Sequence, residues 1–180
     1  SEEVSLDGEI RRMRADNFSI KEKAATSTKT GKLVLVVYQQ KNDSSQIYLY
    51  QLKKRLVTIL YKNPGWGQQI SLDPIHKDGT LPDLFSDGSH VMAYHLRSPN
   101  LKQTKMVILS YARGMLTKQG TLPNAIIQDI NGDGELELIS KLNPLGKLFS
   151  IKCGSFFTMP QNVDQTNIYS CQIGRLFLGS

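Results

Sequence analysis

The chain has 180 residues, of which 39% are hydrophobic and 21% charged, with 7 prolines and 14 glycines. This composition excludes collagen-like, low-complexity and wholly disordered proteins, and the length suits one ordinary domain. The net charge of +6 has no aromatic-interleaved basic stripe beside it, so we expect no nucleic-acid partner. We also expect no membrane span, because the longest apolar run, 33–38, has only the length of a strand.

The first thirty residues differ from the rest of the chain. Ser, Thr, Lys and Ala dominate from 21 to 32, and neither a helical nor a strand period is evident there. We expect residues 1–30 to form a partly ordered arm that could supply closing strands to the remainder. No segment of the chain has the apolar periodicity of a long helix.

From Gly31 onward, short runs of β-branched and aromatic residues alternate with polar turns, which is typical of consecutive antiparallel strands. The sequence therefore predicts an all-β protein. The expected strands are 33–39, 47–52, 56–61, 91–96, 106–111, 125–128 and 135–139.

The runs belong to an internal repeat. Gly31-Lys32-Leu33 aligns with Gly88-Ser89-His90 and with Gly146-Lys147-Leu148, so the period is roughly 57 residues. This defines a repeat domain, 31–180, with units at about 31–87, 88–145 and 146–180. Each unit has roughly the strand content of one β-propeller blade, so we predict a propeller-like fold. Three units are too few to close a propeller, which favours a partial propeller or one completed by the arm or by another subunit.

Residues 129–137, DINGDGELE, place oxygen-bearing side chains at alternate positions with glycines between them. Calcium takes about six to eight oxygen ligands, so the chain must curl tightly around the ion. Carboxylates packed this densely would repel one another without a cation; an acidic turn that binds nothing is the alternative. We predict a Ca²⁺ site. Its ligands are the side chains of Asp129, Asn131, Asp133 and Glu137 and the backbone carbonyl of Glu135.

The flanks of this loop indicate its type. An EF-hand needs a helix on each side and an acidic residue at position twelve, which here is Ser140. Both flanks have strand character instead. The segment 128–138, QDINGDGELEL, resembles the calcium loop of FG-GAP and VCBS repeats, the integrin-α-like propeller family. The chain departs from the family pattern at position nine, where Glu137 stands in place of the usual Asp.

A degenerate copy of the loop lies one repeat earlier. Asp73 precedes Asp129 by about one repeat unit, but the central ligand is lost and Lys77 disfavours a cation. Whether the segment from Asp73 to Asp83 binds a metal stays open at this point. A third echo of the motif, LDGEI, lies at 6–10.

Two cysteines bear on the compartment of the protein. Cys153 and Cys171 fall on the first two predicted strands of the third unit, where a hairpin would set them opposite each other. A disulfide is feasible there, and two buried free thiols are the alternative. Because a disulfide and a calcium site both suit oxidising, calcium-rich surroundings, we expect a secreted protein, extracellular or periplasmic.

The functional hypotheses follow from these features. The histidines show no zinc spacing and no serine lies in a nucleophile elbow, so we expect a non-enzymatic, calcium-stabilised module that binds a protein or a glycan. Trp66, in the glycine-rich loop 63–68, is the predicted anchor, although it could instead cap the core. The alternatives are a propeller-type lyase or hydrolase and a periplasmic inhibitor of a cell-wall hydrolase. The enzyme hypothesis would use Asp83, Asp87 and His90.

Overall fold

The structure is a computed structural model. It describes residues 5–42, 44–65, 67–84, 87–100, 104–123, 125–129, 136–140, 147–150, 155–158, 169–172 and 175–178. Most of these residues lie in antiparallel strands, as predicted, but one α-helix is present where the sequence analysis expects none. The chain divides into two compact units, residues 1–82 with 92–104 and residues 83–91 with 105–180.

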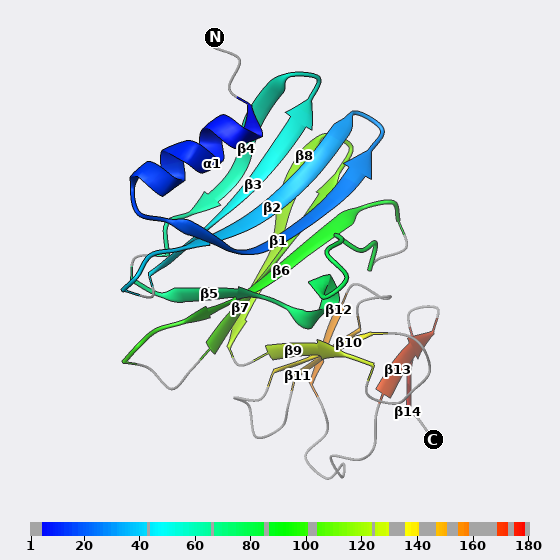
Figure 1. The fold of residues 1–180 in the computed structure, drawn as a ribbon. Coiled ribbons are helices and arrows are strands. Elements are labelled where there is room, and N and C mark those ends of the chain that lie inside the picture. The colour runs from blue at the N-terminus through cyan, green and yellow to red at the C-terminus, as the bar shows by residue number, and fades with distance from the viewer. Residues whose placement is uncertain are drawn as a thin grey trace. The chain divides into compact units, whose positions relative to one another are not determined.

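The first unit is built on a four-stranded antiparallel sheet whose strands follow one another in chain order (Figure 1). Its strands are β1 (Ser19–Thr28), β2 (Gly31–Gln39), β3 (Ser45–Lys53) and β4 (Leu56–Asn63). The predicted strands 33–39, 47–52 and 56–61 fall within β2, β3 and β4. β5 (Gln69–Leu72) pairs with β6 (His90–Arg97), and the short 3-10 helix η1 (Pro74–His76) follows β5.

The expected N-terminal arm contains regular structure. Helix α1 spans Leu6–Ala15, and β1 pairs with β2 over its whole length. The side chain of Ser5 caps the helix by accepting a hydrogen bond from the Gly8 amide at 3.1 Å. Acidic residues in the first turn and basic residues in the last turn suit the helix dipole. The third echo of the calcium motif, 6–10, is therefore part of a helix.

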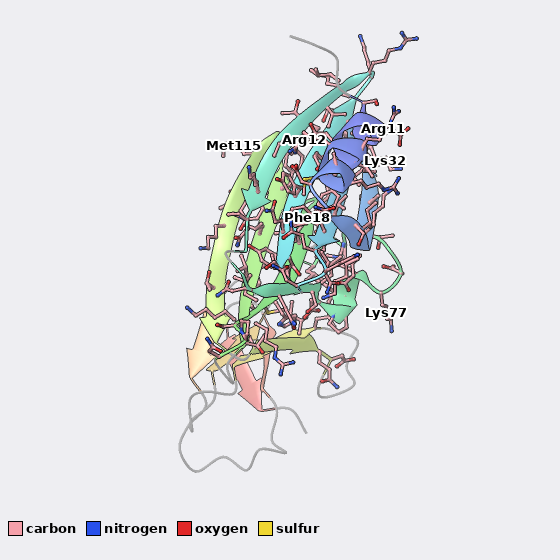
Figure 2. The ribbon with its side chains drawn as sticks, turned by 60° about the vertical axis from the view of Figure 1, so that its left-hand side comes forward. Arg11, Arg12, Phe18, Lys32, Lys77 and Met115 are labelled. Atoms are coloured by element: carbon pink, nitrogen blue, oxygen red, sulfur yellow. The ribbon has the colours of Figure 1, made fainter. Side chains whose placement is uncertain are left out.

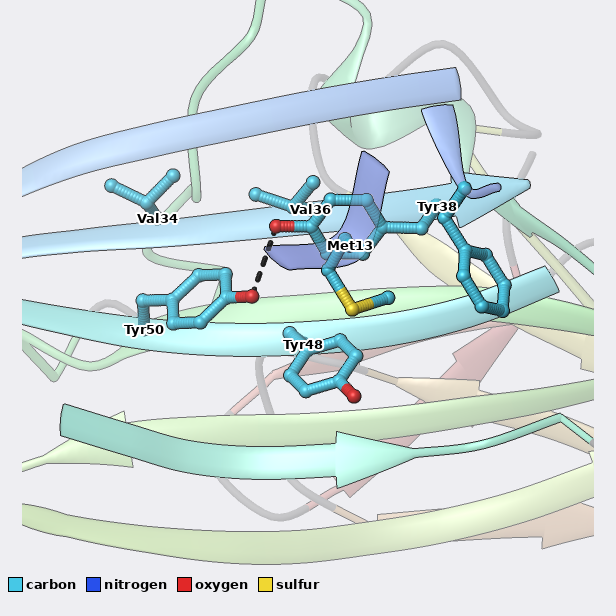
Figure 3. Packing of buried hydrophobic residues seen from close by; sticks show 7 residues of the cluster. Met13, Val34, Val36, Tyr38, Tyr48 and Tyr50 are labelled. Atoms are coloured by element: carbon cyan, nitrogen blue, oxygen red, sulfur yellow. Dashed lines mark hydrogen bonds between the residues drawn. The ribbon is translucent and has the colours of Figure 1, made fainter. Parts of the chain in front are cut away.

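Helix α1 packs on one face of the sheet through a cluster rich in tyrosine (Figure 3). Met13 points from the helix toward Tyr48 and Tyr50, whose rings are stacked with centroids 5.6 Å apart. The Tyr50 and Tyr38 hydroxyls share a hydrogen bond of 2.9 Å, and burial raises the pKa of both groups. The hydroxyls therefore stay neutral, and each satisfies the other inside an apolar core.

The opposite face of the same sheet is buried as well. Leu33, Leu35 and Val37 on β2 alternate with the residues that face α1, and all three have no exposed surface. β5 packs against β2 and β3 within this unit. The continuous apolar run in β2 thus reflects a strand covered on both faces rather than a half-exposed one.

The second unit contains three groups of antiparallel strands. β7 (Thr104–Ala112) pairs with β8 (Met115–Pro123), and β13 (Tyr169–Gln172) pairs with β14 (Arg175–Leu178). Between these pairs in the chain comes a four-stranded sheet, whose strands are again in chain order. It consists of β9 (Ala125–Gln128), β10 (Glu137–Ser140), β11 (Lys147–Ser150) and β12 (Ser155–Thr158).

A tight two-residue hairpin recurs along the chain. Three copies are closed by the pairs Lys53↔Leu56, Ala112↔Met115 and Gln172↔Arg175, and these three follow one another at intervals of roughly 60 residues. A further two-residue hairpin, closed by Thr28↔Gly31, lies outside this spacing. The first two of the three evenly spaced hairpins also share a register shift, at Leu49/Tyr50 and at Ile108/Leu109, with the same spacing as their turns. A β-bulge at the same place in two hairpins is typical of related units.

Candidate functional site

The predicted calcium loop connects two strands of the second unit. β9 ends at Gln128, β10 begins at Glu137, and these two residues are directly paired. Residues 129–136 are therefore the connection of an antiparallel hairpin. The strand flanks predicted from the sequence are confirmed, and they are not the two helices that an EF-hand requires.

The hairpin brings the two ends of the ligand set together. Paired residues of an antiparallel ladder have Cα atoms about 4.5–5.5 Å apart, so Asp129 adjoins the pair that contains Glu137. Asp129 is half-buried, and only the backbone of Glu137 is described. Asn131, Asp133 and Glu135 lie outside the described residues. Within the described part of the chain, no group of three or more His, Cys, Asp or Glu side chains could hold a metal ion.

In the degenerate copy of the loop, residues 73–83, the acidic side chains bond to nearby protein groups. Asp73 is 2% exposed, and its carboxylate accepts hydrogen bonds from the Ile75 amide and the His95 ring, both at 3.0 Å. Asp78 accepts bonds from the amide and hydroxyl of Thr80. Through these contacts with Ile75 and Thr80, both carboxylates cap turns of the backbone.

The buried side chain of His76 holds residues 73–81 in place through two hydrogen bonds. Its Nε2 accepts a hydrogen bond from the Ala93 amide of β6 at 3.0 Å, so its Nδ1 carries the proton and donates to the Thr80 carbonyl at 2.8 Å. Burial lowers the pKa of the ring, which favours this neutral form. The sequence analysis assigns His76 no such role. The Asp73-Pro74 pair, a typical cap and first residue of a helical turn, could have indicated the short helix 74–76 but not the contacts of His76.

The same segment is bound to β1 through the backbone. The Ala25 amide donates to the Gly79 carbonyl, and the Leu81 amide donates to the Thr26 hydroxyl, each at 2.8 Å. We call residues 73–81 the histidine-held segment. Hydrogen bonds to β1 and β6 fix it.

Of the residues of the enzyme hypothesis, Asp83 and Asp87 precede β6 and His90 is its first residue. The Asp83 carboxylate accepts from the amides of Asp87 and Gly88, and Asp87 accepts from the Ser89 amide. The pKa of Asp87 is lowered mainly by Ser89, through its side chain first and its amide second. His90 Nδ1 is buried without a hydrogen-bond partner among the described residues. These contacts stabilise a turn and do not couple a carboxylate to that nitrogen.

Trp66 lies outside the described residues, but the loop on either side of it is well defined. The Asn63 side chain accepts from the Gly65 amide at 3.0 Å and donates to the Tyr94 hydroxyl at 3.0 Å. The Tyr94 and Tyr61 hydroxyls are also hydrogen-bonded to each other. Gln68 closes the loop, because its amide donates to the Gly65 carbonyl at 2.9 Å. Asn63, Gly65 and Gln68 on either side of position 66 are thus fixed by hydrogen bonds.

Substitutions at the two glycines beside Trp66 test the hydrogen-bonded conformation of the residues around it. Both have positive φ, but a Cβ at Gly65 would lie 2.0 Å from the Ser45 carbonyl oxygen, whereas a Cβ at Gly67 would meet nothing within 4 Å. Gly67→Ala should lower the free energy of unfolding by about 1 kcal/mol through backbone strain alone. Gly65→Ala should cost roughly 1–3 kcal/mol more, because the chain must shift. Urea unfolding measures both; equal costs would contradict the close approach to Ser45.

The cysteine prediction falls only partly on described residues. Cys171 lies in β13, opposite Leu176 of β14. Cys153 is outside the described residues, so the disulfide stays a prediction.

The comparisons with known proteins and the membrane criterion complete these observations. In the described part of the chain, no helix is long and apolar enough to cross a membrane. No family model matches the chain, and the comparisons with curated proteins and with solved structures also find no match.

Proposed function

We propose that the protein is a calcium-stabilised, non-enzymatic binding module that acts outside the cytoplasm and recognises a protein or glycan partner. The observation that carries this proposal is the β9–β10 hairpin, which joins an acidic, glycine-containing loop to a strand on each side. Oxygen ligands on a tightly turning connection are what calcium requires. The extracytoplasmic location is supported by the same site and by the predicted Cys153–Cys171 disulfide.

The ion has an ordering role in this proposal. Asp129, Asn131, Asp133, Glu135 and Glu137 would hold Ca²⁺ at the end of the hairpin, and the ion would fix the connection between β9 and β10. One repeat earlier, the histidine-held segment reaches a fixed conformation through hydrogen bonds instead. The two connections would then serve the same structural purpose by different chemistry.

We infer that the chain is an array of blade-like repeats. The even spacing of three of the tight hairpins and the shared bulge support a period close to the one predicted. Helix α1 covers the face of the first sheet against which a further blade would pack. In this interpretation, the first sheet is the capped end of the array, and β1 from the arm completes it.

The partner would bind at the loop 63–68. This loop has a fixed frame, neutral hydrogen-bonding groups on Asn63 and Tyr61, and an aromatic residue at position 66. An aromatic side chain on a preorganised loop can bury a large area without a large entropic cost.

Trp66→Ala should weaken partner binding by more than about 1 kcal/mol, or roughly fivefold, while the melting curve stays unchanged. Trp66→Phe keeps an aromatic ring and should retain most of the affinity. Partners would be identified by capture on the immobilised chain from a native extract and on a glycan array, and affinities would then be measured for each variant. If Trp66→Ala unfolds the chain, Trp66 belongs to the core; if it binds as the original chain does, the loop is not the contact surface.

A further inference from the structure

All of the net charge of the chain lies in the first unit. Residues 1–82 and 92–104 contain 15 Lys and Arg against 9 Asp and Glu, whereas the second unit contains 7 of each. Between Lys23 and Leu72 the sequence has a single acidic residue, Asp43, which comes between β2 and β3 in the chain. The positive charge of the first unit is therefore concentrated on its sheet.

Two hairpin turns meet at one end of this sheet (Figure 1). The β1–β2 turn is closed by Thr28↔Gly31 and the β3–β4 turn by Lys53↔Leu56, and the pair Lys32↔Leu52 joins the two. The turns are packed closely, because a Cβ at Gly31 would lie only 2.3 Å from the Leu52 carbonyl oxygen. We call this end the basic tip. It consists of Lys29, Lys32, Lys53, Lys54, Arg55 and Leu56.

The five cations of the basic tip are all exposed, and Figure 2 shows the side chain of Lys32 among those of the first unit. The connection that contains Asp43 is at the opposite end of β2 and β3. The first turn of α1 carries Asp7 and Glu9, and Glu9 is paired with Arg12 at 3.0 Å. The tip thus presents a clear excess of positive charge.

Apolar surface adjoins these charges. Leu56 is 44% exposed although it is a large aliphatic residue. Beside it is a hollow of about 350 Å³ between the start of α1 and the β3–β4 hairpin. Its lining combines Leu6, Leu52, Leu56 and Val57 with Lys54, Arg55 and Ser5. Leu56 and the hollow form one apolar patch, and covering this patch with another apolar surface would be favourable.

We propose that the basic tip docks the protein peripherally onto an anionic lipid surface. Clustered Lys and Arg are attracted to anionic headgroups, and an adjacent aliphatic side chain can enter the headgroup boundary. The structure favours lipid over nucleic acid, because none of the six tip residues is an aromatic on which bases could stack. The structure also favours lipid over an acidic glycan. A glycan would be attracted by the charges alone, whereas a lipid surface would also cover Leu56 and the apolar hollow.

The test is sedimentation of the full chain with phosphatidylcholine vesicles, with and without phosphatidylglycerol. Binding should require the anionic lipid and weaken as salt is raised. The variant Lys53→Gln/Lys54→Asn/Arg55→Gln should lower partitioning at least about tenfold, because each cation near the surface contributes roughly a factor of five. Asparagine is chosen at Lys54 because that residue has a φ of 57°.

Matched controls come from the related β7–β8 hairpin. Lys105→Gln/Arg113→Asn/Lys118→Gln removes the same charge from the second unit and should change partitioning less than about twofold. Leu56→Ser should lower partitioning about fivefold, whereas Met115→Ser, which changes a residue 68% exposed, should not. Melting curves check that each variant folds, and the single variant Lys53→Gln replaces the triple one if that unfolds.

Three results would overturn the proposal. The first is no binding, or equal binding to neutral and anionic vesicles. The second is unchanged partitioning of the folded tip variants. The third is binding to single-stranded DNA or to an anionic polysaccharide that depends on the cations but not on Leu56, which would assign the tip to a polyanion instead. Partner binding through Trp66 is measured without vesicles, so either proposal can fail alone.

Discussion

The chain is expected to melt at a higher temperature in excess calcium than in a chelator, and Asp133→Ala is expected to remove this difference. An ion that binds only the folded state stabilises it by mass action, by about 2.7 kcal/mol when its free concentration is 100 times the dissociation constant. For a chain of this size, that corresponds to a shift of roughly 5–10 °C. Scanning calorimetry in calcium and in chelator measures it directly.

The control for this experiment is Asp78→Ala. Asp78 is an exposed acidic residue of the histidine-held segment, and its carboxylate bonds only to Thr80 among the contacts described. This variant should keep the full calcium-dependent shift, because in our proposal hydrogen bonds rather than an ion hold this segment. If Asp78→Ala lost the calcium-dependent shift in melting temperature and Asp133→Ala kept it, the ion would bind in the histidine-held segment. That result would contradict the site proposed at 129–137.

His76→Ala should be the most destabilising single change in the histidine-held segment. The ring is 5% exposed and is bonded at both nitrogens, so its removal leaves the Ala93 amide and the Thr80 carbonyl unpaired next to a cavity. We expect a loss of about 2–4 kcal/mol in the free energy of unfolding. Urea unfolding near neutral pH measures this loss.

The contribution of His76 should also depend on pH. Its pKa is lowered in the folded state, chiefly by burial, so the unfolded chain takes up a proton that the folded chain resists. Its stabilising contribution is therefore complete above the unfolded pKa of about 6.5 and decreases as pH falls from there toward the folded pKa. The neighbouring carboxylates of Asp73 and Asp78 oppose this by favouring the charged ring. The difference in stability between the original chain and His76→Ala should thus shrink between neutral and mildly acidic pH, and a constant difference would contradict the assigned tautomer.

The strands could be predicted because their signal is local. Residues 33–39, 47–52 and 125–128 combine β-branched and aromatic side chains with polar turns, and each lies within an observed strand. The helix could not be predicted from apolar periodicity, because α1 is short and Met13 is its only buried residue. Its signals were the Ser5 cap and the acid-to-base order of its charges, which are weaker than a hydrophobic stripe.

The role of His76 depends on contacts that are distant in the sequence. Its partner Ala93 belongs to the next strand of the chain, and Gly79 is held by Ala25 from the much earlier strand β1. No local pattern encodes such pairings, so from the sequence we could interpret 73–83 only as a degenerate copy of the predicted calcium loop. The frame of the Trp66 loop is similar, because it relies on Tyr94 and Ser45 from other strands.

Titration calorimetry of the chelator-stripped full chain tests the proposed calcium loop most directly. We predict one calcium ion bound per chain, no binding by Asp133→Ala and unchanged binding by Asp78→Ala. Absence of binding heat in the original chain, together with an unchanged melting temperature in calcium, would contradict it. Normal calcium binding by Asp133→Ala would contradict it equally.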